Sequence, residues 1–303
     1  MVNTKVNLCG IELDNPVIPA SGTFGFGYEF AELYDINELG TFSFKGTTKD
    51  PRFGNPTPRI AECTSGMINA VGLQNPGVEK VIAEELPKLK ACFHKPVMAN
   101  VSGFSVEDYA YTCEKLDKQE QVGWLEVNVS CPNVKQGAIQ FGQDPKCLSE
   151  ITEKIKRIAK QPVIMKLTPN VTDIAEMARA AEAGGADAIS LINTITGMKI
   201  DIEKRRFVLA NRTGGLSGPA IKPVAVRMVW QAAQAVKIPI IGMGGIASAE
   251  DAVEFMLAGA SAVAVGAMNF HDPCLTQKVV DGMEQYLLRH NIQTVRELTG
   301  AVQ

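Results

Sequence analysis

The sequence lacks the features that would place the chain in a membrane or on a nucleic acid. No apolar run approaches the roughly 20 residues that a transmembrane helix needs. The opening, MVNTKVNLCGIELDNP, does not show the basic and then apolar pattern of a signal peptide. The 303 residues carry 33 acidic and 30 basic side chains, a formal net charge of −3, without a block of like charges. We therefore expect a cytoplasmic protein with a small-molecule ligand and with neither membrane nor nucleic acid as a partner.

Patterns that bind metals are also missing. The seven cysteines are an odd number spread along the chain, and no two of them form a C-x-x-C pair. The three histidines share no ligand spacing. A chain of this size buries a core without disulfides, so we interpret the cysteines as thiols. We expect no metal site on this chain, and any metal centre must lie on a partner.

What the sequence does have is a regular alternation of strand-like and helix-like segments. Two helical segments, residues 173–185 and 249–259, place apolar residues on one face and end in glycine. Eight runs rich in β-forming residues cover residues 15–21, 41–46, 96–103, 124–131, 162–169, 188–194, 239–246 and 262–268. Such alternation predicts parallel strands joined by right-handed crossovers. Eight units in this length predict an α/β fold of one domain, a single (β/α)8 TIM barrel over residues 1–303.

Other segments add to this architecture. Residues 5–15 alternate apolar and polar around Gly10 and predict an N-terminal hairpin that covers the bottom of the barrel. The connections at 47–80, 132–150 and 195–222 are too long for simple crossovers. Each of them follows the carboxyl end of a strand, where barrel active sites are built. An open doubly wound sheet is the alternative, and it is disfavoured because no G-x-G-x-x-G follows the first strand.

Polar side chains stand at the ends of five predicted strands. Their period-2 positions place them facing inward, and they are Lys45, Asn100, Asn128, Lys166 and Asn193. This ring has no clustered carboxylates or histidines, so it predicts a site for a planar, anionic, amide-like molecule without a metal. Glu126 lies two residues before Asn128 and is predicted inside the barrel, paired with Lys166, because an unpaired buried charge is costly. The alternative is a register in which Glu126 faces outward.

Small residues end the seventh and eighth predicted strands. Gly244 and Gly245 follow the seventh, and Gly266 and Ala267 follow the eighth. Many barrels bind a phosphate group at these two turns, because small residues expose backbone N–H groups. We therefore predict a phosphate site here, with ordinary tight-turn glycines as the alternative.

Cys131 is the most informative thiol, because it directly follows the fourth predicted strand within N-V-S-C-P-N. A buried structural role is the usual one for cysteine, but this position is at the catalytic end of the barrel. Nucleophilic chemistry would call for a neighbouring histidine, and none lies at a strand end. Proton abstraction by the thiolate is the better interpretation.

Eight short segments of the sequence are similar to segments of a known family. They are SGTFGFG (21–27), FKGTT (44–48), NAVGLQNPG (69–77), NVSCPNVKQGAIQFG (128–142), KLTPNVTDI (166–174), NTITGMKIDIEKR (193–205), GGLSGPAIKP (214–223) and GMGGI (242–246). In this order they resemble, over essentially the whole chain, the class 1 dihydroorotate dehydrogenases. Class 2 enzymes use Ser at the position of Cys131 and carry an N-terminal extension. The loop after Cys131 is more similar to the NAD-linked class 1B catalytic subunit than to the fumarate-linked class 1A form.

The resemblance implies one FMN per chain and assigns residues to it. The FMN positions are Ser21, Lys45, Gly46, Asn100, Asn128, Lys166, Ile192, Gly218, Gly244, Gly245, Gly266 and Ala267. The positions for the substrate, dihydroorotate, or the product, orotate, are Lys45, Asn69, Ala70, Val71, Gly72, Leu73, Asn128, Asn193 and Thr194. The implied reaction belongs to pyrimidine (UMP) biosynthesis. Cys131 removes a proton from C5 while C6 passes hydride to flavin N5, and Lys166 stabilises the negative charge on the reduced flavin.

The resemblance also implies partners. Class 1B enzymes combine a homodimer of this chain with two electron-transfer subunits, which carry FAD and a [2Fe–2S] cluster and reduce NAD, giving a heterotetramer. Several alternatives stay open. They are a fumarate-linked class 1A homodimer, another flavin barrel that oxidises a dihydropyrimidine, a flavin-free lyase or isomerase whose sugar phosphate binds at Gly244 and Gly266, and a non-enzymatic metabolite-binding barrel.

Overall fold

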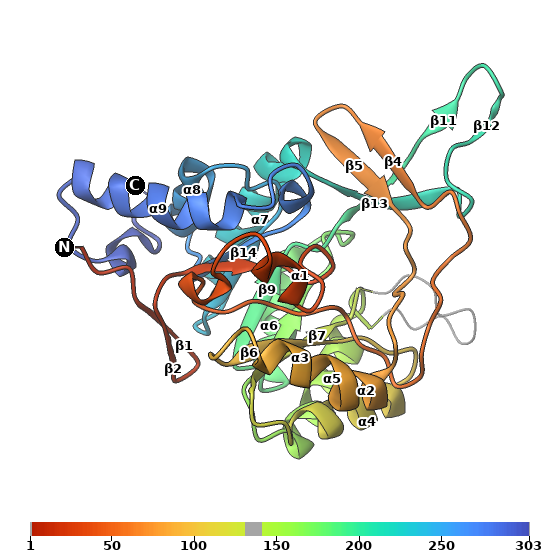
Figure 1. The fold of residues 1–303 in the computed structure, drawn as a ribbon, viewed down its shortest axis with the longest axis horizontal. Coiled ribbons are helices and arrows are strands. Elements are labelled where there is room, and N and C mark those ends of the chain that lie inside the picture. Colours follow the sequence, from red (N-terminus) through yellow and green to blue (C-terminus); the bar gives the residue numbers. More distant parts are fainter. Residues whose placement is uncertain (1, 131–140, 303) are drawn as a thin grey trace.

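The computed structural model describes residues 2–130 and 141–302. Its centre is a curled sheet of parallel strands, surrounded by helices (Figure 1). In sheet order the strands are β3 (Val17–Pro19), β15 (Ala262–Val265), β14 (Ile240–Met243), β9 (Ala188–Leu191), β8 (Val163–Lys166), β7 (Val122–Asn128) and β6 (Val97–Val101). Every one of these strands falls on a predicted run, and each is buried on both faces, as strands covered by helices on a parallel sheet must be.

The remaining predicted strand, at 41–46, closes the barrel without being a continuous strand. Ser43 forms a parallel bridge with Met98 of β6, and its amide donates to the carbonyl of Pro19 in β3 at 3.0 Å. Two residues further on, the amide of Lys45 donates to the carbonyl of Gly25 at 2.9 Å. It therefore does not continue the pairing with β3. The predicted (β/α)8 barrel is confirmed. Its second strand position, between β3 and β6, is occupied by the extended segment 41–46, because the hydrogen bonds of this segment are divided among β3, β6 and the loop at Gly25.

Helices cover the outside of the barrel. The longer ones are α4 (Val106–Leu116), α5 (Pro145–Ile158), α6 (Ile174–Ala183), α7 (Lys222–Ala235), α8 (Ala249–Leu257) and α9 (Leu275–Arg289). A continuous helical segment of α2 (Val78–Lys80), η2 (Val81–Glu85) and α3 (Leu86–Lys90) precedes β6. The remaining short pieces are α1 (Tyr28–Ala31), η1 (Ile36–Glu38), η3 (Pro219–Ile221), η4 (Ala267–Phe270) and η5 (Val295–Leu298).

The two predicted helices lie where their patterns place them. The side chain of Asp173 accepts hydrogen bonds from the amides of Ala175 and Glu176 and caps α6, and Ser248 caps α8 by accepting from the amide of Asp251. In the described parts of the chain, no helix combines the length and apolarity that crossing a membrane would take.

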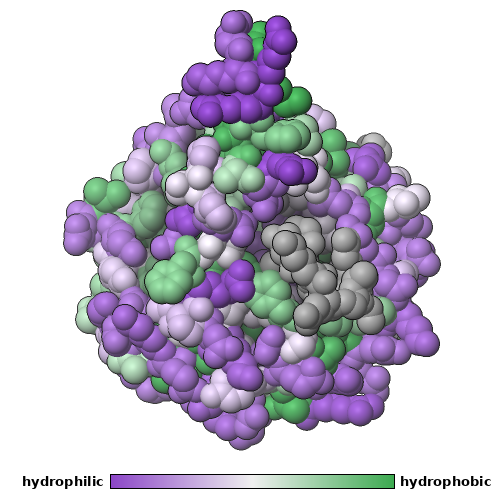
Figure 2. Space-filling model, turned by 90° about the vertical axis from the view of Figure 1, so that its right-hand side faces the viewer, coloured by the Kyte–Doolittle hydropathy of each residue, from purple (hydrophilic) through white to green (hydrophobic). Residues whose placement is uncertain are grey.

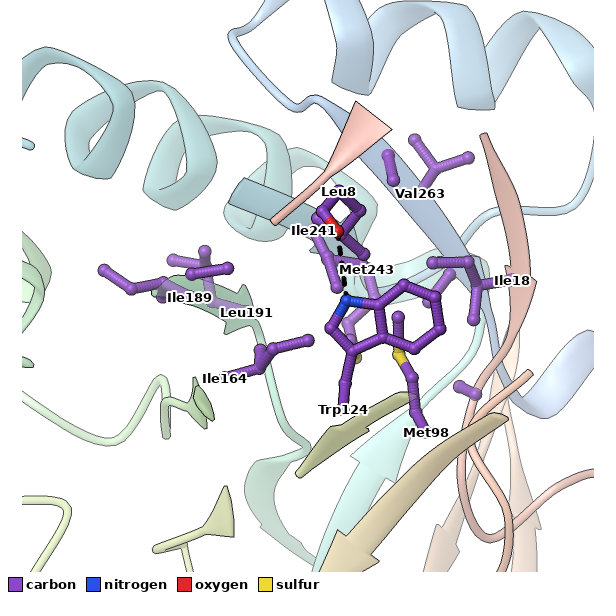
Figure 3. Close-up of a cluster of buried hydrophobic side chains, with 14 of the residues drawn as sticks. Leu8, Ile18, Met98, Trp124, Ile164, Ile189, Leu191, Ile241, Met243 and Val263 are labelled. Atoms are coloured by element: carbon purple, nitrogen blue, oxygen red, sulfur yellow. Dashed lines mark hydrogen bonds between the residues drawn. The ribbon is translucent and has the colours of Figure 1, made fainter. Parts of the chain in front are cut away.

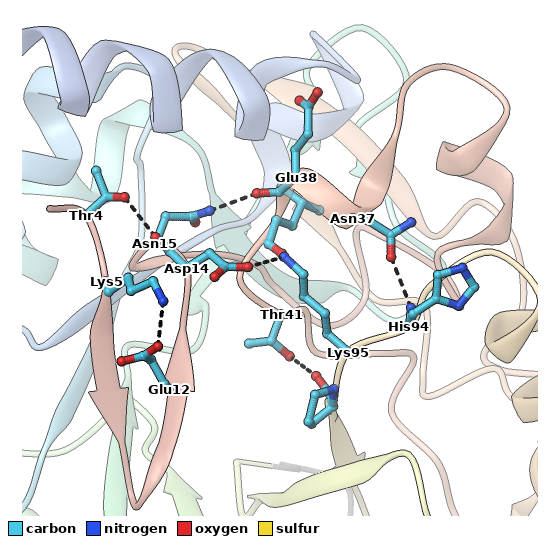
Figure 4. Close-up of polar contacts among 12 residues, drawn as sticks. Thr4, Lys5, Glu12, Asp14, Asn15, Asn37, Glu38, Thr41, His94 and Lys95 are labelled. Carbon is cyan, nitrogen blue, oxygen red and sulfur yellow. Dashed lines mark hydrogen bonds and ion pairs between the residues drawn. The ribbon is translucent and has the colours of Figure 1, made fainter. Parts of the chain in front are cut away.

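The N-terminal hairpin covers the bottom of the barrel, as predicted. It consists of β1 (Val6–Leu8) and β2 (Ile11–Leu13), and an ion pair of 2.7 Å joins Lys5 to Glu12 across its strands. Figure 4 shows this pair and the neighbouring contact of Lys95 with Asp14, which ties the end of the hairpin to the chain just before β6.

Trp124 fills the barrel interior above this hairpin. Its indole N–H donates to the backbone carbonyl of Leu8 at 3.1 Å, and its ring lies among Ile18, Met98 and Ile241 (Figure 3). The side chain is fully buried. The hairpin is therefore joined to the barrel by both apolar contact and a buried hydrogen bond.

Trp124→Phe is expected to lower the free energy of unfolding by about 1–3 kcal/mol, because it removes this hydrogen bond and leaves a gap in the core. Urea denaturation followed by circular dichroism measures the change. The matched control is Trp230→Phe, since Trp230 is 46% exposed on α7 and should change stability by no more than about 0.5 kcal/mol. Equal losses in the two variants would contradict the assignment.

A second sheet, which the sequence patterns did not predict, lies over the carboxyl end of the barrel. Its antiparallel strands, in order, are β10 (Ile195–Met198), β13 (Thr213–Ser217), β5 (Gly66–Asn69) and β4 (Ile60–Cys63), and we call it the roof sheet. The strands β11 (Ile200–Asp201) and β12 (Arg206–Phe207) form an arm that projects beyond it (Figure 1). Two of the three long connections are thus structured, and of the third, 132–150, residues 132–140 lie outside the described residues.

Candidate active site

A cavity of about 520 Å³ lies between the carboxyl ends of the barrel strands and the roof sheet. Figure 2 looks onto the side of the molecule from which the β11–β12 arm projects, and the surface is hollowed below the arm. Most of the residues predicted for the site line this cavity. They are Ser21, Lys45, Asn69, Ala70, Val71, Gly72, Leu73, Asn128, Lys166, Ile192, Asn193, Thr194, Gly218, Gly244, Gly245, Gly266 and Ala267.

Cys131 lies outside the described residues, so its role stays a prediction. Of the described site residues that were predicted, Asn100 and Gly46 do not line the cavity. Asn100 is 1% exposed, and its amide donates to the carboxylate of Glu126 beneath the cavity at 2.6 Å. Gly46 packs against Asn100, because a Cβ built on Gly46 would lie 2.8 Å from the amide oxygen of Asn100. These two residues support the floor of the site.

One end of the cavity is built from glycine turns. Gly244 and Gly245 have φ angles of +125° and +84°, a region that favours glycine. A Cβ on Gly245 would meet the carbonyl oxygen of Gly218 at 2.9 Å. Within the described chain, the amides of Gly245, Gly266 and Ala267 make no backbone hydrogen bond. Backbone donors left without partners need a ligand or water, and three of them around one end suit an anionic group such as phosphate.

The described lining of the cavity carries basic side chains and no acidic ones. Lys45 and Lys166 are the charged side chains on its described lining, and no aspartate or glutamate joins them there. Burial, together with the nearby positive charge of Arg59, lowers the pKa of Lys45 below its ordinary value of 10.5. An anion placed beside Lys45 would offset both effects.

Asparagine side chains fix the middle of the cavity. The amide of Asn193 donates to the side-chain oxygen of Asn128 at 3.1 Å, and the oxygen of Asn193 accepts from the amide of Thr194 at 2.8 Å. The hydroxyl of Tyr109, on α4, donates to the backbone carbonyl of Asn128 at 2.7 Å. The two asparagines are thus held as a hydrogen-bonded pair on the lining of the cavity.

The prediction that Glu126 lies inside the barrel and pairs with Lys166 is confirmed. Glu126 is 1% exposed, and its Oε1 lies 4.0 Å from Nζ of Lys166. Burial acts to raise the pKa of the Glu126 carboxyl. The charge of Lys166 and hydrogen bonds from three side chains outweigh burial, so the pKa is lowered overall.

Two polar residues of the site were missed in the sequence. Asn170 donates to the carbonyl of Thr194 at 3.2 Å and accepts from the amide of Thr196 at 2.9 Å. Asn55 donates to the carbonyl of Ala70 at 2.9 Å. Asn170 ends the phrase KLTPN after a barrel strand, so its place at the strand end was a usable signal. Asn55 offers no such signal, because only the folded loop brings it to residue 70.

The remaining cysteines fit their interpretation as thiols. The six that the structure describes are all free, and Cys113 is buried. Among residues 2–130 and 141–302, no three histidine, cysteine, aspartate or glutamate side chains gather in a group that could hold a metal ion.

The fold and the cavity together define a (β/α)8-barrel protein with a cavity at the carboxyl ends of its strands, lined by two lysines. A family model described as dihydroorotate dehydrogenase matches residues 3–287. A Lachnoclostridium phytofermentans protein named dihydroorotate dehydrogenase B (NAD(+)), catalytic subunit, is 57% identical over 301 residues, which cover 99% of this chain and 100% of that protein. The chain belongs to the dihydroorotate dehydrogenase family.

Other relatives carry the same printed name. The Geotalea uraniireducens protein is 56% identical over 298 residues, covering 98% of this chain and 97% of its own. The Fusobacterium nucleatum protein is 53% identical over 296 residues, also covering 98% of this chain and 97% of its own. These matches extend over the barrel, the roof sheet and the arm alike.

Proposed function

We propose that this protein oxidises (S)-dihydroorotate to orotate in pyrimidine (UMP) biosynthesis, with one FMN bound per chain. The observation that carries the proposal is the arrangement of the cavity. Unpaired backbone amides stand at one end, two lysines and a hydrogen-bonded pair of asparagines also line the cavity, and no acidic side chain is on the described lining. This arrangement suits a phosphate-bearing planar cofactor together with a small planar carboxylate.

The residues present fit FMN. The amides of Gly245, Gly266 and Ala267 would hold its phosphate, since they lack backbone partners in the described chain. The proposed contacts to the rest of the molecule come from Ser21, Lys45, Gly46, Asn100, Asn128, Lys166, Ile192, Gly218 and Gly244. When bound, FMN supplies the acceptor for the hydride that leaves C6 of dihydroorotate.

The substrate would be held by residues at strand ends and by one stretch of the 47–80 connection. Lys45 would pair with its carboxylate, and the proposed ring contacts come from residues 69–73, Asn128, Asn193 and Thr194. Cys131 takes the proton from C5 as a thiolate base. Loss of that proton from C5 and of hydride from C6 leaves the C5=C6 double bond of orotate, so atoms and electrons balance.

The electrons leave through a partner subunit in this proposal. The relatives' printed names include both NAD(+) and catalytic subunit, which supports a division of the reaction between two kinds of chain. We infer that a second subunit with FAD and a [2Fe–2S] cluster passes electrons to NAD, and that two copies of each chain form a cytoplasmic heterotetramer around a homodimer of this chain.

Spectroscopy tests the proposal. The purified protein should absorb as a flavoprotein or take up FMN, and anaerobic addition of dihydroorotate should bleach the flavin. A protein that binds no FMN would contradict the proposal, as would a flavin that dihydroorotate does not reduce. Co-purification of an iron–sulfur subunit supports the NAD-linked form, whereas rapid reoxidation by fumarate would indicate the class 1A form instead.

The affinity for orotate should depend on pH through Lys45. A lysine carries its charge below its pKa, and the pKa of Lys45 is lowered, so its charge is lost at a lower pH than for an ordinary lysine. We expect orotate to bind roughly tenfold more weakly once pH has risen through that pKa, as for the loss of one hydrogen bond to a charged group. Titration of the flavin spectrum with orotate measures this. Lys45→Arg is the control, because arginine stays charged; an unchanged pH profile in that variant would contradict the role of Lys45.

A further inference from the structure

The carboxylate of Glu126 is sealed inside the barrel below the cavity and joins neighbouring parts of its wall. Its Oε2 accepts from the hydroxyl of Ser43 at 2.7 Å and from the amide of Asn100 at 2.6 Å. Its Oε1 accepts from the hydroxyl of Ser190 at 2.8 Å and faces Lys166. The partners come from the 41–46 segment, β6, β9 and β8, on both sides of β7. One side chain therefore fixes five consecutive positions around the barrel.

The carboxylate of Glu126 takes its hydrogen bonds from one set of groups and its counter-charge from another. Three uncharged donors occupy the carboxylate, and Nζ of Lys166 stays 4.0 Å away, beyond hydrogen-bond range. Lys166 itself is 6% exposed and lines the cavity. In the part of the chain that the structure describes, its ammonium donates no hydrogen bond. Glu126 thus balances the charge of Lys166 from behind and leaves its N–H groups for a ligand in the cavity.

Lys45 provides an internal comparison. It lines the same cavity and is also largely buried, but no ion pair joins it to an acidic group in the described residues. Its pKa is lowered, by burial first and then by Arg59. Of the two lysines on the described lining, Lys166 has a buried carboxylate behind it and Lys45 has none.

We propose that Glu126 is a positioning residue, which holds Lys166 charged and directed at the bound flavin and thereby sets the equilibrium between oxidised and reduced FMN. This inference rests on the proposed function. The other described side chains on Glu126, those of Ser43, Asn100 and Ser190, are uncharged, so the Glu126–Lys166 pair determines the charge at the floor of the cavity. A cation beside the flavin favours the electron-rich reduced form, and a carboxylate behind that cation moderates the effect.

The first experiment uses the apoprotein and needs no flavin. Trace acetylation with acetic anhydride, followed by mass spectrometry, reports how readily each lysine loses its proton. In Glu126→Gln, Lys166 should be acetylated about tenfold faster than in the wild type at pH 8, because a counter-charge at this distance is worth one or more pH units. Lys45 should keep its rate and serves as the standard within the same cavity. An unchanged rate at Lys166 would overturn the proposal.

The second experiment uses the protein with FMN bound. Equilibration with a dye of known potential should show that Glu126→Gln changes the equilibrium constant of flavin reduction by about tenfold, or about 30 mV for a two-electron couple. At pH 6 the change should favour the reduced flavin, since Lys166 keeps its charge while the opposing carboxylate has gone.

Ser190→Ala is the matched control. It removes one uncharged hydrogen bond to Glu126 and keeps the carboxylate. It should lower thermal stability but leave the acetylation of Lys166 and the reduction equilibrium within about twofold of the wild type, since it leaves the charge pair intact. If Glu126→Gln behaves like Ser190→Ala, by changing stability alone, then Glu126 is merely structural and the proposal is wrong.

The wild type keeps the proposal testable if Glu126→Gln does not fold. Across pH, the acetylation of Lys45 should rise at lower pH than that of Lys166; coinciding or reversed profiles would overturn the inference. The proposed function and the proposed role of Glu126 can be contradicted independently of each other. A protein that binds no FMN contradicts the proposed function, while the labelling of Lys166 still reports on Glu126.

Discussion

Replacing Cys131 with serine should slow the reduction of the bound flavin by dihydroorotate by a factor of roughly 10²–10⁴, the usual contribution of a general base. The flavin should stay bound, because the proposed FMN contacts come from other residues. A hydroxyl holds its proton far more tightly than a thiol, so the variant has no base of suitable strength. Anaerobic stopped-flow measurement of flavin bleaching gives the rate directly.

The pH dependence of the same measurement separates a base from a structural cysteine. A free thiol has a pKa of about 8.5, so wild-type reduction should speed up as pH rises through that range. The serine variant should lose this rise. Cys147→Ser, on α5 and away from the lining of the cavity, is the control and should reduce at the wild-type rate. Reduction near the wild-type rate in Cys131→Ser would remove Cys131 from the base role.

Gly245→Ala should weaken FMN binding by roughly 100-fold, or about 3 kcal/mol. Gly245 has a φ of +84°, where an alanine side chain is strained, and its new methyl group would meet Cβ of Lys222 at 2.8 Å and the carbonyl of Gly218 at 2.9 Å. Relief of these contacts moves the turn whose amide is proposed to hold the phosphate. Titration of the apoprotein with FMN, followed by flavin fluorescence, measures the loss.

Gly10→Ala is the matched control for this substitution. Gly10 has a similar φ of +90°, but no atom lies within 4 Å of the added carbon, and it stands in the hairpin at the opposite end of the barrel. It should cost a little stability through backbone strain and leave FMN affinity unchanged. Equal FMN affinity in the two variants would show that the Gly245 turn does not hold the cofactor.

The barrel and its inward polar ring could be predicted from sequence because their signals are local. A parallel strand shows as a short apolar run, and period 2 places the side chain of Lys166 or Asn128 on the inner face. The same reasoning placed Glu126 in the interior, where the structure has it. These inferences need no knowledge of which strand pairs with which.

The roof sheet could not be predicted because its pairing is distant and its strands are short. Gly215 of β13 pairs with Asn69 of β5, nearly half the chain away, and β13 itself reads TGGLS, a composition typical of a loop. Asn55 was missed because only the folded loop brings it to Ala70. The segment 41–46 was over-assigned as a strand, since its composition favours β structure but its hydrogen bonds are divided among neighbours.

The roof sheet joins the connections 47–80 and 195–222, which are far apart in the sequence, into one hydrogen-bonded unit. Asn69 pairs with Gly215 through the backbone, and Thr194 packs so closely on Gly215 that any side chain there would collide with it. The two groups of proposed substrate contacts are therefore coupled, and a shift in one carries the other with it. The glycine turns for the phosphate follow barrel strands and lie outside this unit. Substrate selectivity is therefore best re-engineered in the roof sheet away from the end of β13, because Gly218, a proposed FMN contact, directly follows that strand and packs against Gly245.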